Sequence, residues 1–229
     1  MVDMEDFDRF AGVGIAGQTA LQSLAPYVTA GDRVFINGGS GGCGMFAIQL
    51  AKILGCQVTT TCSTRNVALC RDLGADEVID YTATPDLAAV LASHGRIKEG
   101  SKNDAPAYSH VVDHIGLPHD LYSQSHRFLL PGKSWVQVGT DRFSTLAGRL
   151  LRPGFLGGGR RSFVPFFFRN RRCDLLQLGR WVQEGRLRVV IDSVYDMKDA
   201  RSALERLRSG RATGKIIVHD PANQYLDWE

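Results

Sequence analysis

Cysteine is scarce in this sequence and follows no pattern. The 229 residues contain five cysteines without a C-x-x-C pair, namely Cys43, Cys56, Cys62, Cys70 and Cys173. A small, odd and scattered set indicates neither a disulfide framework nor a zinc cluster. It is typical of a reduced, intracellular protein, and we expect a cytoplasmic location.

Long apolar runs and a strong charge of one sign are also lacking. No apolar stretch is long enough to span a bilayer, and the N-terminal "MVDMEDFDRF" has no apolar signal-peptide core. The net charge is only +3, and no RNA- or DNA-binding signature accompanies the arginines of residues 142–172. We therefore expect no membrane partner and no nucleic-acid partner.

What the sequence does contain is a regular alternation of strand-like and helix-like segments. Strands are expected over residues 33–37, 57–63, 77–81, 109–115 and 134–139, and helices over 44–54, 65–73, 86–93 and 121–130. Repeated strand–helix units predict a parallel sheet covered by helices on both faces. The expected fold class is therefore α/β, a Rossmann-type doubly wound parallel sheet.

The pattern changes after residue 141. A basic, glycine-rich stretch leads to the apolar run "FVPFFF" at residues 163–168. We expect this run to be an edge strand or a contact between chains, because its proline suits the edge of a sheet. The remaining segments predict helices over 173–184 and 199–210 and strands over 189–195 and 214–220.

The run "GGSGGCG" at residues 38–44 matches three motifs. The G-x-S-x-G of serine hydrolases would make Ser40 a nucleophile, but too few residues precede it for the strands and the oxyanion loop of that fold. The G-x-x-x-G-x-G of short-chain reductases requires a Tyr-x-x-x-Lys, and none of the six tyrosines has lysine four residues later.

The third motif, G-x-G-x-x-G, indicates a dinucleotide site. Gly39, Gly41 and Gly44 would let the backbone turn tightly against a pyrophosphate, at the positive end of the helix that starts near Gly42. The alternative is a bare glycine turn. The position of the run between a strand and an amphipathic helix favours the dinucleotide.

The end of the second strand predicts which dinucleotide is bound. NAD enzymes place a carboxylate there, about 20 residues after the glycines, to bind the ribose 2′-hydroxyl. No carboxylate occurs between Cys56 and Cys70. The tip instead carries side chains suited to a 2′-phosphate, which are Ser63, Thr64, Arg65 and Asn66. We predict NADP(H); the alternative is that Arg65 is a solvated residue at a helix start.

Several sequence segments, in this order along the chain, resemble those of one known family. They are "GQTALQSL", "DRVFINGGSGGCGMFAIQLAKILG", "TCSTRN", "LGADEVIDYT", "VVDHIG", "LPGKSWVQVG" and "GRATGKIIV". The chain is identified as a member of the medium-chain dehydrogenase/reductase superfamily, and it is similar to the zinc-independent quinone-oxidoreductase and enoyl-reductase branch. The resemblance implies a dinucleotide-binding core over residues 1–141 and its remainder over 142–188. Residues 189–229 would be a segment that in the family completes a second domain.

The resemblance also implies roles by position. Thr19 would lie near the nicotinamide, and Lys215 would approach it from the C-terminal segment with Phe155 and Leu156. Residues 40–44 would hold the pyrophosphate, with Cys43 in place of the usual valine, and Ser63, Arg65 and Tyr81 would surround the 2′-phosphate. The nicotinamide side would be lined by His114, Ile115, Gly116, Val138, Gly139 and Thr140.

Two departures from the family pattern stand out. The N-terminal substrate domain of the family would precede "GQTALQSL" and is expected to be absent. The strands at 189–195 and 214–220 would then lack their partners, which predicts a homodimer through exposed strands or a truncated form. The other departure is His114, which stands where a small or hydroxyl residue is expected.

No metal is predicted, because the sequence lacks a zinc-ligand spacing. His110, His114 and His119 suggest no fixed tetrahedral geometry. His114 is a candidate for a catalytic group that protonates product or stabilises an enolate, because a residue at the end of the fourth strand faces the ligand crevice. The alternative is a loop histidine bonded to backbone.

The expected activity follows from the resemblance. The chain is expected to be an NADPH-dependent oxidoreductase that transfers a hydride to a small-molecule enone, quinone or enoyl thioester. Three alternatives stay open: a partner or regulatory module that binds NADP(H) without redox turnover, an enzyme that uses the pocket for a cyclisation or isomerisation, and an inactive fragment.

Overall fold

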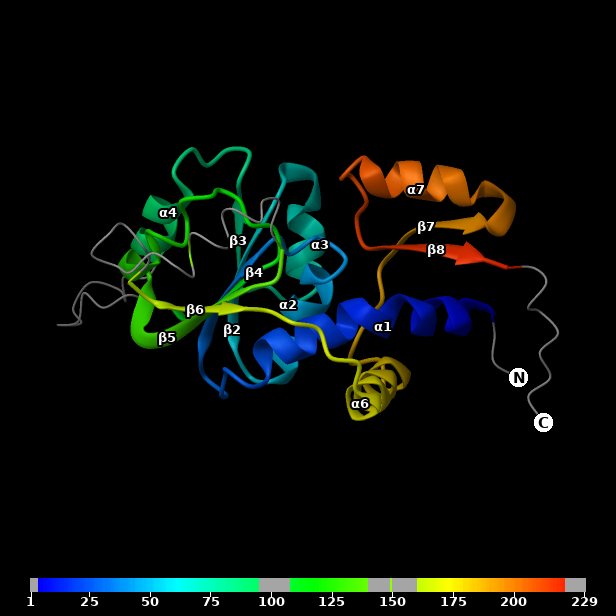
Figure 1. Ribbon diagram of the computed structural model, residues 1–229, viewed down its shortest axis with the longest axis horizontal. Helices are drawn as coiled ribbons and strands as arrows, with labels where there is room; N and C mark the ends of the chain where they lie inside the picture. The colour runs from blue at the N-terminus through cyan, green and yellow to red at the C-terminus, as the bar shows by residue number, and fades with distance from the viewer. Residues whose placement is uncertain (1–3, 95–107, 140–148, 150–159, 221–229) are drawn as a thin grey trace.

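A six-stranded parallel sheet forms the centre of the molecule. The computed structural model describes residues 4–94, 108–139, 149 and 160–220, with the backbone alone for residues 4–6 (Figure 1). The strands are ordered β3-β2-β1-β4-β5-β6. Their bounds are β1 Arg33–Asn37, β2 Gln57–Cys62, β3 Glu77–Asp80, β4 Tyr108–Asp113, β5 Leu129–Gln137 and β6 Ser162–Pro165. This order confirms the Rossmann-type fold class.

Helices cover both faces of the sheet, as the sequence predicts. One face packs against α1 (Met4–Leu24), α2 (Gly44–Ile53), α3 (Val67–Asp72, after the 3₁₀ turn η1, Thr64–Asn66) and α6 (Arg172–Gln183). The other face packs against α4 (Leu87–His94) and the segment that contains the 3₁₀ turn η2 (Ser125–Arg127). Two apolar cores result, one on each side of the sheet.

The two middle strands, β1 and β4, place the functional edge. Both are buried, and their apolar residues form continuous runs because each strand is covered on two faces. β1 pairs with β2 on one side and with β4 on the other, so the strand order reverses at the boundary between β1 and β4. In open parallel sheets, ligands bind in the crevice beyond the carboxyl ends of the strands at this switch point.

The C-terminal residues form a separate unit with its own two-stranded parallel sheet. It consists of β7 (Ile191–Asp196), the 3₁₀ turn η4 (Met197–Asp199), α7 (Ala200–Arg208) and β8 (Lys215–His219). The unit lies beside the N-terminal half of α1 (Figure 1), where Nε2 of His219 contacts a carboxylate oxygen of Asp8. Val194 and Val218 are exposed on it, and the homodimer expected through these strands stays a prediction.

The helix predicted over residues 121–130 is wrong. Only the short turn η2 forms there, and Leu129 already belongs to β5. Ser123 donates its hydroxyl to the carbonyl of Asp120 at 2.6 Å, and the ring of His126 bonds the carbonyl of Ser123 at 3.1 Å. Side chains that bond nearby backbone groups compete with a helix, so the segment forms turns instead.

The apolar run of residues 163–168 begins within the last strand of the central sheet. β6 contains Pro165 and is the outermost strand, which confirms an edge strand within the apolar run.

The long helix α1 was not predicted. Its Gly12 and Gly17 have low helix propensity, but the missing side chains let Val189 and Leu178 pack close to the helix. Among the described helices, none has the length and apolarity that crossing a bilayer requires.

Candidate cofactor site

The glycine-rich loop joins β1 to α2 at the switch point of the sheet. Gly39 donates its N–H to the carbonyl of Thr61 at 2.8 Å, which ties the loop to β2. A Cβ added at Gly39 would lie 2.2 Å from the Thr60 hydroxyl oxygen, and one at Gly44 would lie 2.0 Å from the carbonyl oxygen of Gly38. These two glycines are therefore required by the close approach of neighbouring backbone and side chains.

Gly41 and Gly42 are different, because the protein leaves room beside them. The nearest atom to a Cβ at Gly41 would be the carbonyl oxygen of Gly38 at 3.5 Å, an ordinary contact. Cys43 stands at the N-cap of α2 and makes no side-chain capping bond. The start of α2 thus offers uncapped N–H groups beside an open backbone turn, an arrangement that fits the pyrophosphate of a dinucleotide.

A buried polar network holds the ends of β1, β2 and β4 together. Asn37 donates its side-chain amide to Oδ1 of Asp113 at 2.9 Å and accepts the Thr61 hydroxyl at 2.7 Å. Oδ1 of Asp113 also accepts the backbone N–H groups of Ile115 at 3.0 Å and Gly116 at 2.8 Å. The network fixes the turn after β4 relative to the glycine-rich loop. The sequence prediction missed Asn37 and Asp113, although a polar residue that ends an apolar strand was the available signal.

His114 directly follows β4 at this edge. Its backbone N–H donates to the carbonyl of Asn37 at 3.2 Å, and Gly139 lies against its carbonyl group. Both ring nitrogens are buried and have no hydrogen-bond partner among the described residues. Burial lowers the pKa of His114 to about 4, so the imidazole is neutral at pH 7 and carries one N–H donor. A loop histidine bonded to backbone through its ring, the alternative for this residue, is not what the described residues show.

The four residues predicted to surround a 2′-phosphate follow β2 directly. Asn66 donates its side-chain amide to the Ser40 hydroxyl at 3.0 Å, which connects this corner to the glycine-rich loop. Arg65 is exposed and donates Nη2 to the carbonyl of Arg211 at 3.0 Å. Ser63 and Thr64 lie beside them in the N-terminal cap and first residue of η1. The structure therefore brings the predicted corner and the predicted loop together.

A carboxylate that the sequence prediction missed lies at the same corner. Asp80 ends β3 and accepts the hydroxyl of Thr64 and the hydroxyl of Thr82, each at 2.6 Å. These bonds hold the pKa of Asp80 below its ordinary value. Each oxygen of Asp80 thus accepts a threonine hydroxyl on its own side, and each keeps further acceptor capacity. Tyr81 follows it with 56% of its surface exposed.

Lys215 reaches the site from the C-terminal unit. A Cβ added at Gly42 would lie 3.6 Å from Nζ of Lys215. Burial raises the pKa of the neighbouring Cys43 thiol, and the positive charge of Lys215 opposes that rise. A lysine ammonium at this point adds positive charge beside the glycine-rich loop, as a bound pyrophosphate would require.

The remaining predicted residues divide into three groups. Val138 and Gly139 lie at the edge, because both donate their N–H groups to the carbonyl of Asp113. Thr19 is buried in α1, and its expected contact with the nicotinamide stays a prediction. The other three calls fall outside the described residues; they are Thr140, Phe155 and Leu156.

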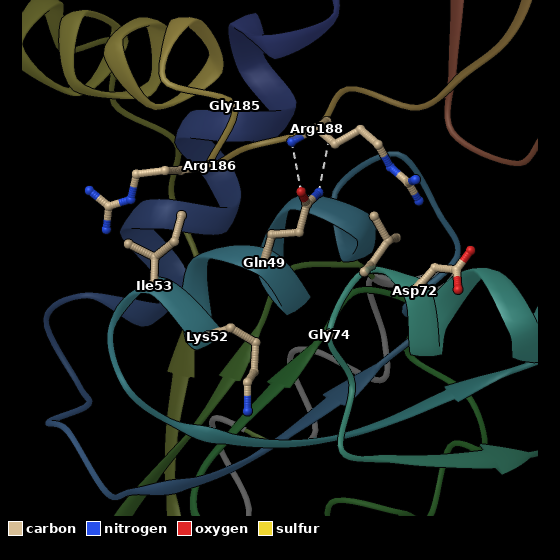
Figure 2. Close-up of a pocket in the computed structure, with 9 residues that line it drawn as sticks. Gln49, Lys52, Ile53, Asp72, Gly74, Gly185, Arg186 and Arg188 are labelled. Carbon is tan, nitrogen blue, oxygen red and sulfur yellow. Dashed lines mark hydrogen bonds between the residues drawn. The ribbon is translucent and has the colours of Figure 1, made fainter.

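A pocket of about 520 Å³ opens elsewhere on the molecule (Figure 2). It is lined by Gln49, Lys52, Ile53, Asp72, Leu73, Gly74, Gly185, Arg186 and Arg188. These residues lie toward the carboxyl ends of α2 and α3 and just after α6, whereas the predicted site lies at the amino ends of α2 and α3. Helix carboxyl ends favour cations, which accounts for the basic side chains there. The pocket shares no residue with the predicted cofactor set.

Within this pocket, Gln49 attaches the segment after α6 to α2. Figure 2 shows its side-chain amide facing the backbone of Arg188. Oε1 of Gln49 accepts the N–H of Arg188 at 2.7 Å, and Nε2 donates to the Arg188 carbonyl at 2.9 Å. The side chain of Gln49 thus bonds Arg188 as a neighbouring strand would.

Comparison with known proteins agrees with the sheet order and the glycine-rich turn. The sequence pattern of a family described as "Zinc-binding dehydrogenase" matches residues 73–218. The chain belongs to the medium-chain dehydrogenase/reductase superfamily. Within this superfamily it falls in the quinone- and enoyl-reductase-like branch.

Three relatives illustrate the match. The chain is 48% identical over 217 residues to trans-enoyl reductase pgmF of Aspergillus terreus, which covers 91% of this chain and 58% of that protein. It is 38% identical to trans-enoyl reductase poxH of Penicillium oxalicum, with 91% and 55% covered. The structure of the quinone oxidoreductase from Coxiella burnetii aligns with a TM-score of 0.74 at 33% identity, with 91% and 59% covered. The chain thus spans less than two thirds of each relative's length.

The description of the matching family names zinc, and a zinc ion needs a defined set of ligands. Structural zinc sites use four Cys or His ligands, and catalytic sites use three protein ligands. Across the described parts of the chain, no three His, Cys, Asp or Glu side chains gather as such a site requires. These residues do not fit a zinc ion, and the absence of a metal from the whole chain stays a prediction.

Proposed function

We propose that the chain binds NADP(H) at the carboxyl edge of its sheet and serves as an oxidoreductase that reduces a small-molecule enone, enoyl thioester or quinone. The observation that carries the proposal is the open, uncapped turn at Gly41 and Gly42, at the switch point of the sheet. The printed names of the relatives, trans-enoyl reductase and quinone oxidoreductase, support the substrate class. When bound, NADPH supplies a hydride from its nicotinamide ring.

The chain's own residues divide the binding of the dinucleotide between them. The N–H groups at the start of α2 face the pyrophosphate, and Lys215 adds positive charge beside them. The exposed guanidinium of Arg65 offers the 2′-phosphate a charge-assisted fork, and Ser63 adds a hydroxyl. These groups favour NADP(H) over NAD(H), because a guanidinium and hydroxyl groups suit a 2′-phosphate and no carboxylate occurs among residues 63–66 directly after β2.

His114 is the group we assign to the substrate. Reduction of an activated alkene or quinone places negative charge on a carbonyl oxygen, and a hydrogen-bond donor aimed at that oxygen stabilises it. The imidazole of His114 is neutral. Its ring nitrogens are buried at the carboxyl edge of the sheet and have no hydrogen-bond partner among the described residues. Its one N–H would donate to this oxygen.

Binding is tested by titrating the full chain with NADPH and NADH and following nicotinamide fluorescence and heat. We expect NADPH to bind more tightly than NADH. Gly41→Ala should weaken the binding of both dinucleotides. The protein has room for the added methyl group, but a bound pyrophosphate would collide with it. Gly179→Ala is the matched control, since it lies in α6 with only an ordinary contact at 3.8 Å to Phe10. Equal affinity for the two dinucleotides would sink the NADP(H) assignment.

Turnover is tested by following NADPH consumption with enones, quinones and enoyl thioesters. His114→Gln should lower kcat at least tenfold while leaving the Kd for NADPH within about twofold, as loss of one oxyanion donor does. His94→Gln, at the end of α4, is the control. Unchanged turnover of His114→Gln would remove this histidine from the mechanism. Binding without any turnover would instead favour a cofactor-binding module.

A further inference from the structure

Two arginine side chains, one aspartate and the backbone carbonyl of Arg211 meet between the C-terminal unit and the corner after β2. The aspartate is Asp192 of β7, whose side chain is only 6% exposed. Arg206 of α7 donates to both of its carboxylate oxygens, Nη2 to Oδ1 at 2.6 Å and Nε to Oδ2 at 2.9 Å. This two-bond pairing is the main reason why the pKa of Asp192 falls to about 2. The pair is therefore ionised and fixed in geometry at neutral pH.

The same ion pair holds the turn of residues 211–213, between α7 and β8. Oδ1 of Asp192 accepts the backbone N–H of Thr213 at 2.8 Å. Nη2 of Arg206 donates to the carbonyl of Arg211 at 3.3 Å. One bond from each member of the pair thus reaches the turn, so the position of the turn depends on Asp192.

The turn of residues 211–213 also contacts the corner that is predicted to bind the 2′-phosphate. The carbonyl of Arg211 accepts Nη2 of Arg65 at 3.0 Å, and the hydroxyl of Thr213 donates to Oδ1 of Asn66 at 3.3 Å. Asn66 donates onward to Ser40 of the glycine-rich loop. A continuous chain of hydrogen bonds therefore runs from Asp192 to the loop, and the carbonyl of Arg211 lies between two guanidinium groups.

The charges in this cluster do not balance. Asp192 neutralises Arg206, but no carboxylate among the described residues lies within ion-pair distance of Arg65 or Arg211. The positive charge of Arg65 thus remains without a carboxylate partner beside the corner, and a phosphate would compensate it. An arginine whose position is already fixed also loses less conformational freedom when it binds.

We propose that Asp192 is a positioning residue, which acts through Arg206 and the turn of residues 211–213 to orient Arg65 for the 2′-phosphate and so sets the preference for NADPH over NADH. This assignment rests on the proposed function and adds the origin of its cofactor preference. The second sheet, by this account, contributes to dinucleotide selection without containing the glycine-rich loop.

The experiment compares Asp192→Asn with Asp196→Asn in the full chain. Asp196 lies on the same strand, is exposed and pairs with Lys198 at 3.1 Å. We expect Asp192→Asn to reduce the ratio of the Kd for NADH to the Kd for NADPH about tenfold, which corresponds to about 1.4 kcal/mol. Asp196→Asn should leave the ratio unchanged. A general loosening of the fold would weaken both dinucleotides equally and leave the ratio constant.

Arg65→Ala provides the coupling test. If Asp192 acts through Arg65, Asp192→Asn should lower the ratio in the unsubstituted chain and have no further effect in the Arg65→Ala background. Arg206→Lys keeps the positive charge but loses the two-bond pairing with Asp192, so it should lower the ratio by a smaller factor. If Asp192→Asn does not fold, Arg206→Lys takes its place in the comparison with Asp196→Asn.

Two results would overturn the proposal: an equal ratio for Asp192→Asn and Asp196→Asn, or an undiminished effect of Asp192→Asn in the Arg65→Ala background. Failure of the unsubstituted chain to bind either dinucleotide would be a distinct result. It would overturn the proposed function and this assignment with it.

Discussion

Two strand–helix–strand units of this molecule share a topology but are held together differently. In β1–α2–β2, the central residues Val34, Phe35 and Ile36 are wholly buried, and α2 is buried along most of its length. In β7–α7–β8, Val194 is 45% exposed, and the only buried residue of α7 is Ala203. The second unit relies on the ion pair between Asp192 and Arg206.

The difference follows from what each unit must do. Apolar burial is non-directional and scales with area, so it supplies stability without fixing one particular turn. A bidentate ion pair is directional and holds specific atoms at specific places. The first unit therefore stabilises the site, and the second determines the position of a turn beside it.

The largest expected effect breaks the first unit. Phe35→Ala removes a ring at the centre of β1 that packs against Tyr108 and Phe128. Because the side chain is fully buried, we expect the free energy of unfolding to fall by about 3–5 kcal/mol. Urea denaturation measures this change. Phe167→Ala, at a site 75% exposed, is the matched control and should change stability by less than about 0.5 kcal/mol. Similar losses for the two variants would contradict the difference in burial.

The next effect tests the polar link at the carboxyl edge. Asn37→Ala leaves the Thr61 hydroxyl without its acceptor and takes one donor from Asp113. We expect a loss of about 1–3 kcal/mol in the free energy of unfolding, because buried polar groups are left unpaired. The Kd for NADPH should rise as well, since the loop loses its anchor. Asn170→Ala, at an exposed asparagine, is the control, and an equal effect there would refute the role of burial.

A smaller effect appears as a pH dependence of stability. Burial lowers the pKa of both His110 and His114 to about 4 from an ordinary value of 6.5. Between these values the unfolded chain binds more protons, so stability should fall as the pH drops from 6.5 toward 4. Each imidazole contributes at most about 1.4 kcal/mol per pH unit.

Chemical denaturation at several pH values tests this dependence. His114→Gln should flatten the fall, because it removes one of the two buried imidazoles. Identical slopes for the unsubstituted chain and His114→Gln would show that this imidazole is not buried in the folded protein.

The smallest expected effect concerns the exposed face of the second unit. Val194→Thr should change the free energy of unfolding by less than about 0.5 kcal/mol, because the side chain is largely in water. A larger loss that grows with protein concentration would show instead that this strand is covered in a homodimer, which we proposed from the sequence. Light scattering over the same concentration range separates the two outcomes.

Features that depend on local sequence signals could be predicted, whereas features that depend on contacts between distant residues could not. β1, α2 and the glycine-rich turn were predicted correctly, because apolar spacing and glycine are local signals. The helix over residues 121–130 was wrong, since the side chains of Ser123 and His126 bond backbone groups beside them. The link between Asp192 and Thr213 could not be predicted. It joins a carboxylate to a backbone N–H 21 residues away, and in the sequence Asp192 looks like any surface charge.

The contact of Gln49 with Arg188 has a mechanical consequence. Among the described residues, side-chain hydrogen bonds attach the C-terminal unit and the segment that leads into it to the rest of the molecule at three places: Arg188 to Gln49 in α2, Arg211 and Thr213 to Arg65 and Asn66 before α3, and His219 to Asp8 in α1. A body joined at one place can swivel about it, and rotation about any one of these contacts is opposed by the other two. Any hinge motion of the unit must therefore break at least one of them, and the Gln49 contact is remote from the dinucleotide.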